Sequence, residues 1–202
     1  MTPFYVDDHI LLAEKPAGLL SVPGRSEPDC LITRLQRHYP DALTVHRLDM
    51  ATSGLMIFAR GAAMQRQLSM AFAARQVAKR YIAVVAGHTP DTGEIDLPLI
   101  TDWPNRPRQI VDHAIGKPSL TRYRTLARDG ETSRVELEPV TGRSHQLRVH
   151  MMAIAHPILG DEFYAPPAIF AAAPRLLLHA QGLSLPHPVM GETLTFTSEP
   201  PF

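Results

Sequence analysis

The chain of 202 residues has one cysteine, Cys30, and no apolar run long enough to cross a lipid bilayer. A single cysteine excludes an internal disulfide and a cysteine-rich zinc site, and a membrane-spanning helix needs about 20 apolar residues. The N-terminal segment has neither the basic start nor the long apolar stretch of a signal peptide. These absences predict a cytoplasmic protein without a membrane partner.

Motifs of several metal-dependent and nucleophilic enzymes are also missing. The chain has no Gly-x-Ser-x-Gly and no Gly-x-x-x-x-Gly-Lys, the signatures of many serine hydrolases and of P-loop proteins. His145, His150 and His156 are spaced by five and six residues, whereas a helical metal site places two ligands four residues apart. The Pro-Cys-x-x-Cys of zinc base deaminases cannot occur with one cysteine. We therefore expect chemistry that needs neither a metal nor a cofactor.

Acidic residues are absent from one long stretch, although the chain has 20 basic and 20 acidic residues and no net charge. Residues 50–90 contain no Asp or Glu, and the stretches 103–111 and 140–160 are likewise free of acids but carry arginines. Such segregation predicts a positive surface suited to phosphates, rather than arginines scattered over solvated faces. The basic residues of the first stretch are Arg60, Arg66, Arg75, Lys79 and Arg80.

Apolar patterning and turn residues predict an α+β fold with a mainly antiparallel sheet and a few helices. The length favours one domain over residues 1–202, in one or two lobes. Strands are expected at 4–6, 10–13, 55–59, 79–86, 119–126 and 133–137, the last two joined by the Asp129-Gly130 turn. Helices are expected at 31–38, capped by Pro28-Asp29, at 62–74 and at 144–155, with short strands after them.

The segment from His46 to Gly54 places one carboxylate, Asp49, behind a His-Arg pair and ahead of a Thr-Ser-Gly turn. A buried strand follows, so Asp49 lies on a loop held by a rigid scaffold, where reactive groups tend to occur. The carboxylate either caps the turn through the amides of Ala51 or Thr52 or takes part in chemistry.

A second segment, residues 141–150, leads from a glycine turn into a helix with two arginines. If Arg143 faces solvent, Arg148 faces another side and can pair inward with a carboxylate, either as a structural ion pair or to keep a buried aspartate ionised. Tyr81 follows Lys79-Arg80 on a strand, where it is either a core residue or an aromatic that stacks on an exposed base.

These segments together resemble the RluA family of pseudouridine synthases over nearly the whole chain. His46-Arg47-Leu48-Asp49 with Thr52-Ser53-Gly54 is similar to the motif of the catalytic aspartate, and Lys79-Arg80-Tyr81 resembles the Lys-x-Tyr motif. The remaining matching segments are Gly116–Pro118 with Thr121 and Tyr123, Thr141–His150, His156–Asp161 with Tyr164, and Arg175–Ala180. The resemblance implies a pseudouridine synthase fold with a central catalytic cleft and no S4-like N-terminal module.

The resemblance also implies roles for individual residues. Asp49 would act at the target uridine, Tyr81 would stack on the uracil and take the C5 proton, and Arg148 would hold Asp49 ionised. Arg47 would fill the gap left by the flipped base, and Leu177 or Leu178 would back the ring of Tyr81. Further contacts with RNA are expected from His46, Thr52 and Arg143.

The implied substrates are a loop of 23S ribosomal RNA and the anticodon loop of tRNA, bound by a monomer. Two other functions fit parts of the pattern: an RNA-binding protein without catalysis, and a hydrolase of N-glycosidic bonds. The hydrolase is disfavoured because glycoside hydrolysis usually needs two carboxylates, whereas the Asp49 loop supplies one.

Overall fold

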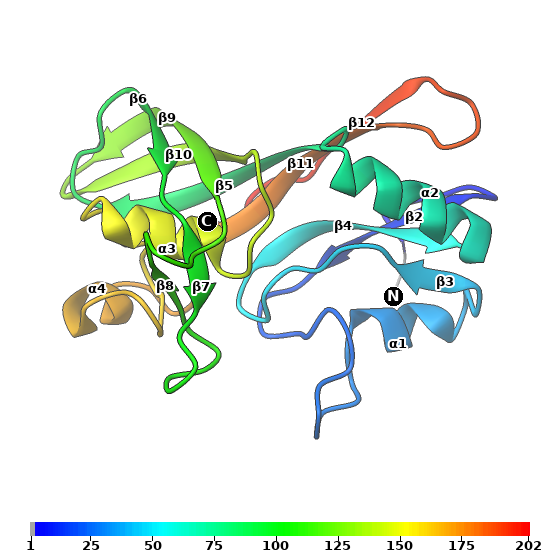
Figure 1. The fold of residues 1–202 in the computed structure, drawn as a ribbon, viewed down its shortest axis with the longest axis horizontal. Coiled ribbons are helices and arrows are strands. Elements are labelled where there is room, and N and C mark those ends of the chain that lie inside the picture. The colour runs from blue at the N-terminus through cyan, green and yellow to red at the C-terminus, as the bar shows by residue number, and fades with distance from the viewer. Residues whose placement is uncertain (1–2) are drawn as a thin grey trace. The chain divides into compact units, whose positions relative to one another are not determined.

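The computed structural model describes residues 3–202, which form two compact units (Figure 1). Unit 1 contains the chain as far as Lys79 and the segment Ala180–Pro201, and unit 2 contains Arg80–His179 and Phe202. Met1 and Thr2, which begin the N-terminal segment considered above, lie outside the described residues. The interpretation of residues 1–202 as one domain stays a prediction.

Unit 1 is an antiparallel sheet with two helices. Its elements are β1 (Tyr5–Val6), β2 (Ile10–Lys15), α1 (Leu31–Gln36), β3 (Ala42–Thr44), β4 (Ser53–Arg60), α2 (Ala62–Ala73), most of β11 (Leu178–Pro186) and β12 (Thr193–Thr197). Strand β4 pairs with β2 and β3 and lies next to β11, which pairs with β12. Helix α2 packs along β4, and α1 packs against β3. The core between these elements includes Leu12, Ile57 and Leu68.

Unit 2 has a second antiparallel group of strands and a small hairpin. Its elements are most of β5 (Ala78–Ala86), β6 (Thr92–Asp96), β7 (Leu99–Thr101), β8 (Gln109–Val111), β9 (Leu120–Asp129), β10 (Thr132–Pro139), α3 (Gln146–Ala153) and α4 (Pro167–Ala171). Strand β10 pairs with β5 and β9, β9 pairs with β6, and β7 pairs with β8. Helix α3 packs against β8, β9 and β10.

The structure confirms the α+β class and most expected elements, and it corrects three of them. Helix α1 is capped by Cys30 instead of Pro28-Asp29, because Cys30 and the Thr33 side chain bond reciprocally. Helix α3 begins at Gln146 instead of Ser144, since His145 adopts a left-handed conformation with φ of 52°. The region after residue 155 contains α4 and the nine-residue strand β11 in addition to a short strand. No helix within residues 3–202 is long and apolar enough to span a membrane.

Candidate active site

Asp49 lies in unit 1 on the loop between β3 and β4, and both of its neighbours are fixed by hydrogen bonds. The Ser21 hydroxyl donates to the Leu48 carbonyl at 2.6 Å and accepts from the Leu48 amide at 3.0 Å. The Met50 carbonyl accepts from the Gly18 amide at 2.9 Å. The turn itself is closed by the backbone, since the Thr52 amide donates to the Asp49 carbonyl at 3.1 Å. The position of Asp49 is therefore set through backbone contacts on both sides.

Lys15 is the most unusual part of this anchor, because its side chain is fully buried. Its ammonium group donates to the carbonyls of Pro16, Leu19 and Met50 at 3.0, 2.7 and 2.9 Å. An ammonium group has three donors, and a buried charge is tolerated only when it is well bonded. Lys15 thus ties the end of β2 to the residue that follows Asp49.

His46 fixes the start of the same loop as a neutral ring. Its Nε2 accepts from the Ile57 amide at 3.0 Å, so this nitrogen carries no proton, and the ring stacks on Phe72 at 4.7 Å. Burial, and secondarily the charge of Lys79, lowers the pKa of His46 to about 3. His46 therefore stays uncharged at neutral pH and holds the loop against β4.

The Thr-Ser-Gly turn is packed too tightly for other residues. Gly54 has φ of 117°, and a Cβ at this position would collide with the backbone carbonyl of Ala180, so only glycine fits without strain. Thr52 is 2% exposed, which favours a role in the turn over direct contact with RNA.

Arg148 lies in unit 2 on α3 and forms a buried ion pair. Its Nε and one terminal nitrogen donate to the two oxygens of Asp161 at 2.8 and 2.6 Å, and the side chains are 2% and 1% exposed. The guanidinium carbon also lies 5.1 Å from the ring centre of Phe163 and 5.2 Å from that of Tyr164. This bidentate geometry fixes the guanidinium plane.

Tyr164 connects the ion pair of Arg148 and Asp161 to the hairpin of β7 and β8. Its hydroxyl accepts from the Gln109 amide at 2.8 Å and lies 2.7 Å from Nδ1 of His145, whose ring stacks on Phe163. The loop of the hairpin carries Trp103, which is 64% exposed, with the guanidinium of Arg106 4.7 Å from its ring centre. An exposed aromatic ring beside a cation can stack on an RNA base.

The predicted site residues divide between the two units. Unit 1 contains His46, Arg47, Asp49 and Thr52, and unit 2 contains Tyr81, Arg143, Arg148 and Leu177. Arg47 and Arg143 are exposed, whereas Tyr81 is half-buried on β5 opposite Leu137 of β10. Contacts between the two groups, including the expected pair of Arg148 with Asp49, stay predictions.

The predicted basic stretch of residues 50–90 is only partly available for RNA. Arg60 forms an ion pair with Asp41 at 3.0 Å, and Arg80 lies 4.0 Å from Glu136. Arg66 and Arg75 are exposed, and Arg75 follows the end of α2. The positive surface is thus smaller than the sequence suggests.

The three histidines near α3 have partners within unit 2. His150 is buried, with Nδ1 2.9 Å from the Thr121 hydroxyl and Nε2 3.0 Å from the Leu97 carbonyl, and burial lowers its pKa. Nδ1 of His156 lies 2.8 Å from the Ala86 carbonyl. These rings connect α3 and the following turn to neighbouring strands.

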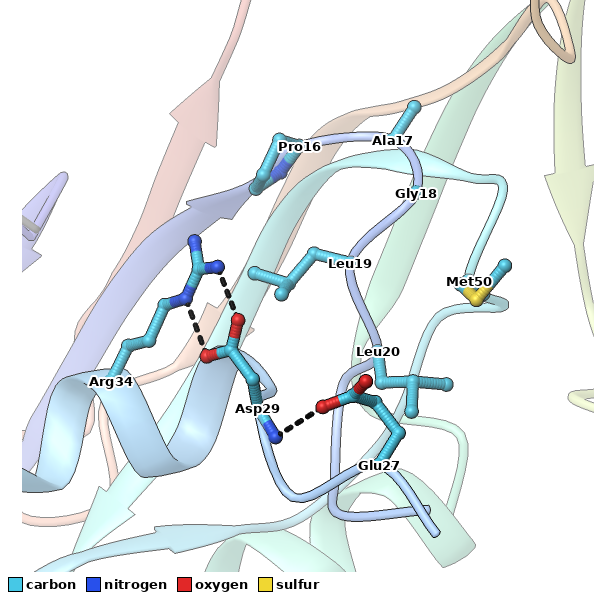
Figure 2. Close-up of a pocket in the computed structure, with 9 residues that line it drawn as sticks. All are labelled: Pro16, Ala17, Gly18, Leu19, Leu20, Glu27, Asp29, Arg34 and Met50. Atoms are coloured by element: carbon cyan, nitrogen blue, oxygen red, sulfur yellow. Dashed lines mark hydrogen bonds and ion pairs between the residues drawn. The ribbon is translucent and has the colours of Figure 1, made fainter.

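A pocket of about 450 Å³ lies next to the Asp49 loop within unit 1 (Figure 2). Figure 2 shows the ion pair of Asp29 and Arg34 on one side of the segment Gly18–Leu20 and Met50 on the other. Its lining residues are Pro16, Ala17, Gly18, Leu19, Leu20, Glu27, Asp29, Arg34 and Met50.

Sequence reasoning missed the residues that hold this site in place: Lys15, Ser21, Asp161 and Tyr164. The available signal for Lys15 was its position two residues after the apolar run Ile10–Ala13 and directly before a proline. Asp161 and Tyr164 lie in segments that resemble the family, but the resemblance assigned no role to either residue.

Comparisons with known proteins agree with this arrangement. The sequence model of a family described as RNA pseudouridylate synthase matches residues 9–153. The chain is 54% identical over 202 aligned positions to the dual-specificity RNA pseudouridine synthase RluA of Escherichia coli (strain K12), with 98% of this chain and 92% of that protein covered. The enzyme of the same name from Yersinia pestis is 52% identical, with both chains covered completely.

Solved structures give a similar result. The human RNA pseudouridylate synthase domain containing 1 aligns over 100% of this chain and 84% of its own, with a TM-score of 0.85 and 28% identity. The human domain containing 4 aligns over 98% of this chain and 88% of its own, with a TM-score of 0.80 and 25% identity.

Proposed function

The chain belongs to the RNA pseudouridylate synthase family, and we propose that Asp49 is the carboxylate that acts at the target uridine. The protein is an isomerase that converts uridine to pseudouridine in RNA. This activity excludes the two alternatives raised by the sequence, RNA binding without catalysis and hydrolysis that releases uracil. The anchored turn of Asp49, with Leu48 and Met50 bonded on either side, carries the proposal.

The reaction breaks the N1–C1′ bond, rotates the uracil and forms a C5–C1′ bond; the C5 proton leaves to solvent, and N1 takes up one proton from solvent. Atoms are conserved, so the rearrangement consumes no co-reactant. The base must leave the stack to rotate. In our proposal Tyr81 stacks on the uracil and takes the C5 proton, Arg47 occupies the vacated place, and Leu177 backs the Tyr81 ring. The exposure of Arg47 and the half-buried position of Tyr81 support these roles.

Arg148 is proposed to pair with Asp49 and keep it ionised, because a neighbouring positive charge offsets the cost of burying a carboxylate. The support is its fixed geometry. Asp161 occupies Nε and one terminal nitrogen of the guanidinium, and a guanidinium offers five N–H donors along more than one edge. One arginine can thus bind two carboxylates.

The substrates are proposed to be a loop of 23S ribosomal RNA and the anticodon loop of tRNA, bound by a cytoplasmic monomer without a metal. Relatives more than 50% identical over nearly the whole chain are named dual-specificity RNA pseudouridine synthases, which supports two RNA classes. The hairpin loop with Trp103 and Arg106, and the exposed Arg143, are the expected RNA contacts in unit 2.

Asp49→Asn tests the proposal. The variant should lose more than about 10³-fold in single-turnover rate on RNA labelled with tritium at uridine C5, because no carboxylate remains to react. RNA binding, measured by filter retention, should change by less than about twofold. Asp41→Asn, on an exposed carboxylate of the same unit, is the control and should keep the full rate. Wild-type turnover by Asp49→Asn would refute the assignment.

A further inference from the structure

The pocket beside the Asp49 loop has no part in the chemistry above. Its floor is the segment Gly18–Leu20, and Met50 forms one wall (Figure 2). The volume of about 450 Å³ falls within the range of about 300–1,000 Å³ typical of small-ligand sites. A single nucleobase with part of its sugar is small enough for such a site.

The charges of the pocket disfavour a phosphate. Arg34 is bound to Asp29, with Nε 2.8 Å from one carboxylate oxygen, so these two charges offset each other. Glu27 supplies the remaining charge, which is negative, and one of its oxygens accepts from the Asp29 amide at 2.9 Å. This bond orients the carboxylate at the pocket. A negatively charged wall repels phosphate and attracts groups that donate N–H bonds.

The other walls suit the flat faces of a base. Leu19 is buried, Leu20 is half-buried, and Met50 is 49% exposed. Leucine and methionine side chains pack on aromatic rings, and the thioether adapts to their shape. The faces of a base held between these side chains would pack on apolar surface, and an amino group at its edge would donate a hydrogen bond to the Glu27 carboxylate.

The pocket is continuous with the proposed catalytic turn. Met50 follows Asp49 directly, and its carbonyl accepts from both Lys15 and Gly18 at 2.9 Å. An RNA whose target uridine reaches Asp49 therefore has its neighbouring unpaired nucleotides within reach of the pocket. Carboxylates read exocyclic amino groups, as in the pairing of Glu with cytosine N4.

We propose that this pocket receives an unpaired nucleobase near the target uridine, and that Glu27 accepts a hydrogen bond from its exocyclic amino group. The inference rests on the proposed role of Asp49, since it is this residue that places the RNA beside the pocket. Glu27 then determines which RNA loops are good substrates, because uracil lacks an amino group and would bind the pocket less well.

The test uses stem-loop RNAs in which each amino-bearing loop base is replaced in turn by its counterpart without the group, such as inosine for guanosine or purine riboside for adenosine. At one position the replacement should lower kcat/KM of the wild-type protein about tenfold, the cost of one hydrogen bond to a charged group. Glu27→Ala should lower kcat/KM to the same extent on the parent RNA, with no further loss on the altered RNA. Glu14→Ala, on an exposed carboxylate of β2 outside the pocket, should behave as wild type.

Two outcomes would overturn the inference while leaving Asp49 in its role. In the first, removal of an amino group lowers kcat/KM as much for Glu27→Ala as for the wild-type protein. That amino group would then be recognised by another part of the protein. The second is tighter binding of all RNAs by Glu27→Ala, which would indicate a phosphate at the pocket. Single-turnover rates at saturating enzyme separate the two proposals, because Glu27→Ala should keep the wild-type rate there, whereas Asp49→Asn should not.

Discussion

In unit 1 the residues on either side of Asp49 are held through their backbone groups, whereas in unit 2 the guanidinium of Arg148 is held through its side chain. Lys15 and Ser21 bond the carbonyls of Met50 and Leu48, while Asp161 binds Arg148 directly. Backbone anchoring positions Asp49 through the two residues beside it. Side-chain anchoring fixes the plane of a cation and adds an opposite charge. Each method suits the role proposed for the residue that it holds.

The largest expected effect on stability is in unit 2. Asp161→Asn keeps the shape of the side chain but removes the charge opposite Arg148, and breaking a buried ion pair on one side costs about 3–5 kcal/mol. The free energy of unfolding, measured by urea denaturation, should fall by that amount. Asp91→Asn breaks the exposed pair with Arg128 in the same unit and should cost less than about 1 kcal/mol. Similar losses in the two variants would contradict the importance given to the buried pair.

A smaller effect is expected for the anchor in unit 1. Lys15→Met leaves three carbonyls without their charged donor but also removes the cost of burying the charge, so we expect a loss of about 2 kcal/mol in the free energy of unfolding. Because Met50 would lose one of its two bonds, the single-turnover rate should also fall about tenfold or more through misplacement of Asp49.

Lys79→Met is the matched control for Lys15→Met. Lys79 is half-buried in unit 1, burial lowers the pKa of its amine, and the described residues give it no hydrogen bond or ion pair. Its replacement should leave the free energy of unfolding unchanged or raise it. If both lysine variants lose equal stability, the three carbonyl contacts do not explain the role of Lys15.

The sequence predicts the parts of this site that depend on local pattern. The run Leu55–Ala59 is apolar at every position, and it forms the buried strand β4. Hydrogen bonds and ion pairs between residues far apart in the chain could not be predicted from local pattern. The carbonyls around Lys15 converge from two segments 30 or more residues apart in the chain. Asp161 reaches Arg148 across 13 residues, because the chain turns back after α3.

Local conformation was the other source of error. Histidine adopts a left-handed backbone more often than most residues but far less readily than glycine, so the residue type of His145 does not predict it and the expected start of α3 is two residues early. The cap of α1 was assigned to Pro28-Asp29 because Asp is a frequent capping residue. In the structure the Asp29 carboxylate binds Arg34, and that competing partner could not be inferred from spacing alone.

The smallest effect concerns pH and the neutral anchor of the Asp49 loop. The pKa of His46 is about 3 in the folded protein and about 6.5 when unfolded, so between these values the unfolded chain binds the extra proton. The stability that His46 contributes is therefore complete above pH 6.5 and decreases as the pH falls. His46→Gln keeps an acceptor for the Ile57 amide but does not titrate. Between pH 7 and pH 5 the wild type should lose about 1 kcal/mol of unfolding free energy relative to this variant. This value already allows for the partial exposure of the ring.

His46→Leu separates the charge of this residue from its hydrogen bond. The variant cannot titrate, so it should show the same pH-dependent shift against the wild type as His46→Gln. It also leaves the Ile57 amide without its acceptor, so it should be less stable than His46→Gln by about 1–2 kcal/mol at every pH. A wild-type difference that stays constant from pH 7 to pH 5 would mean that His46 does not act as a buried neutral acceptor. The ring would then have the same pKa in the folded and the unfolded protein, and a buried neutral ring would not explain how the start of the Asp49 loop is held.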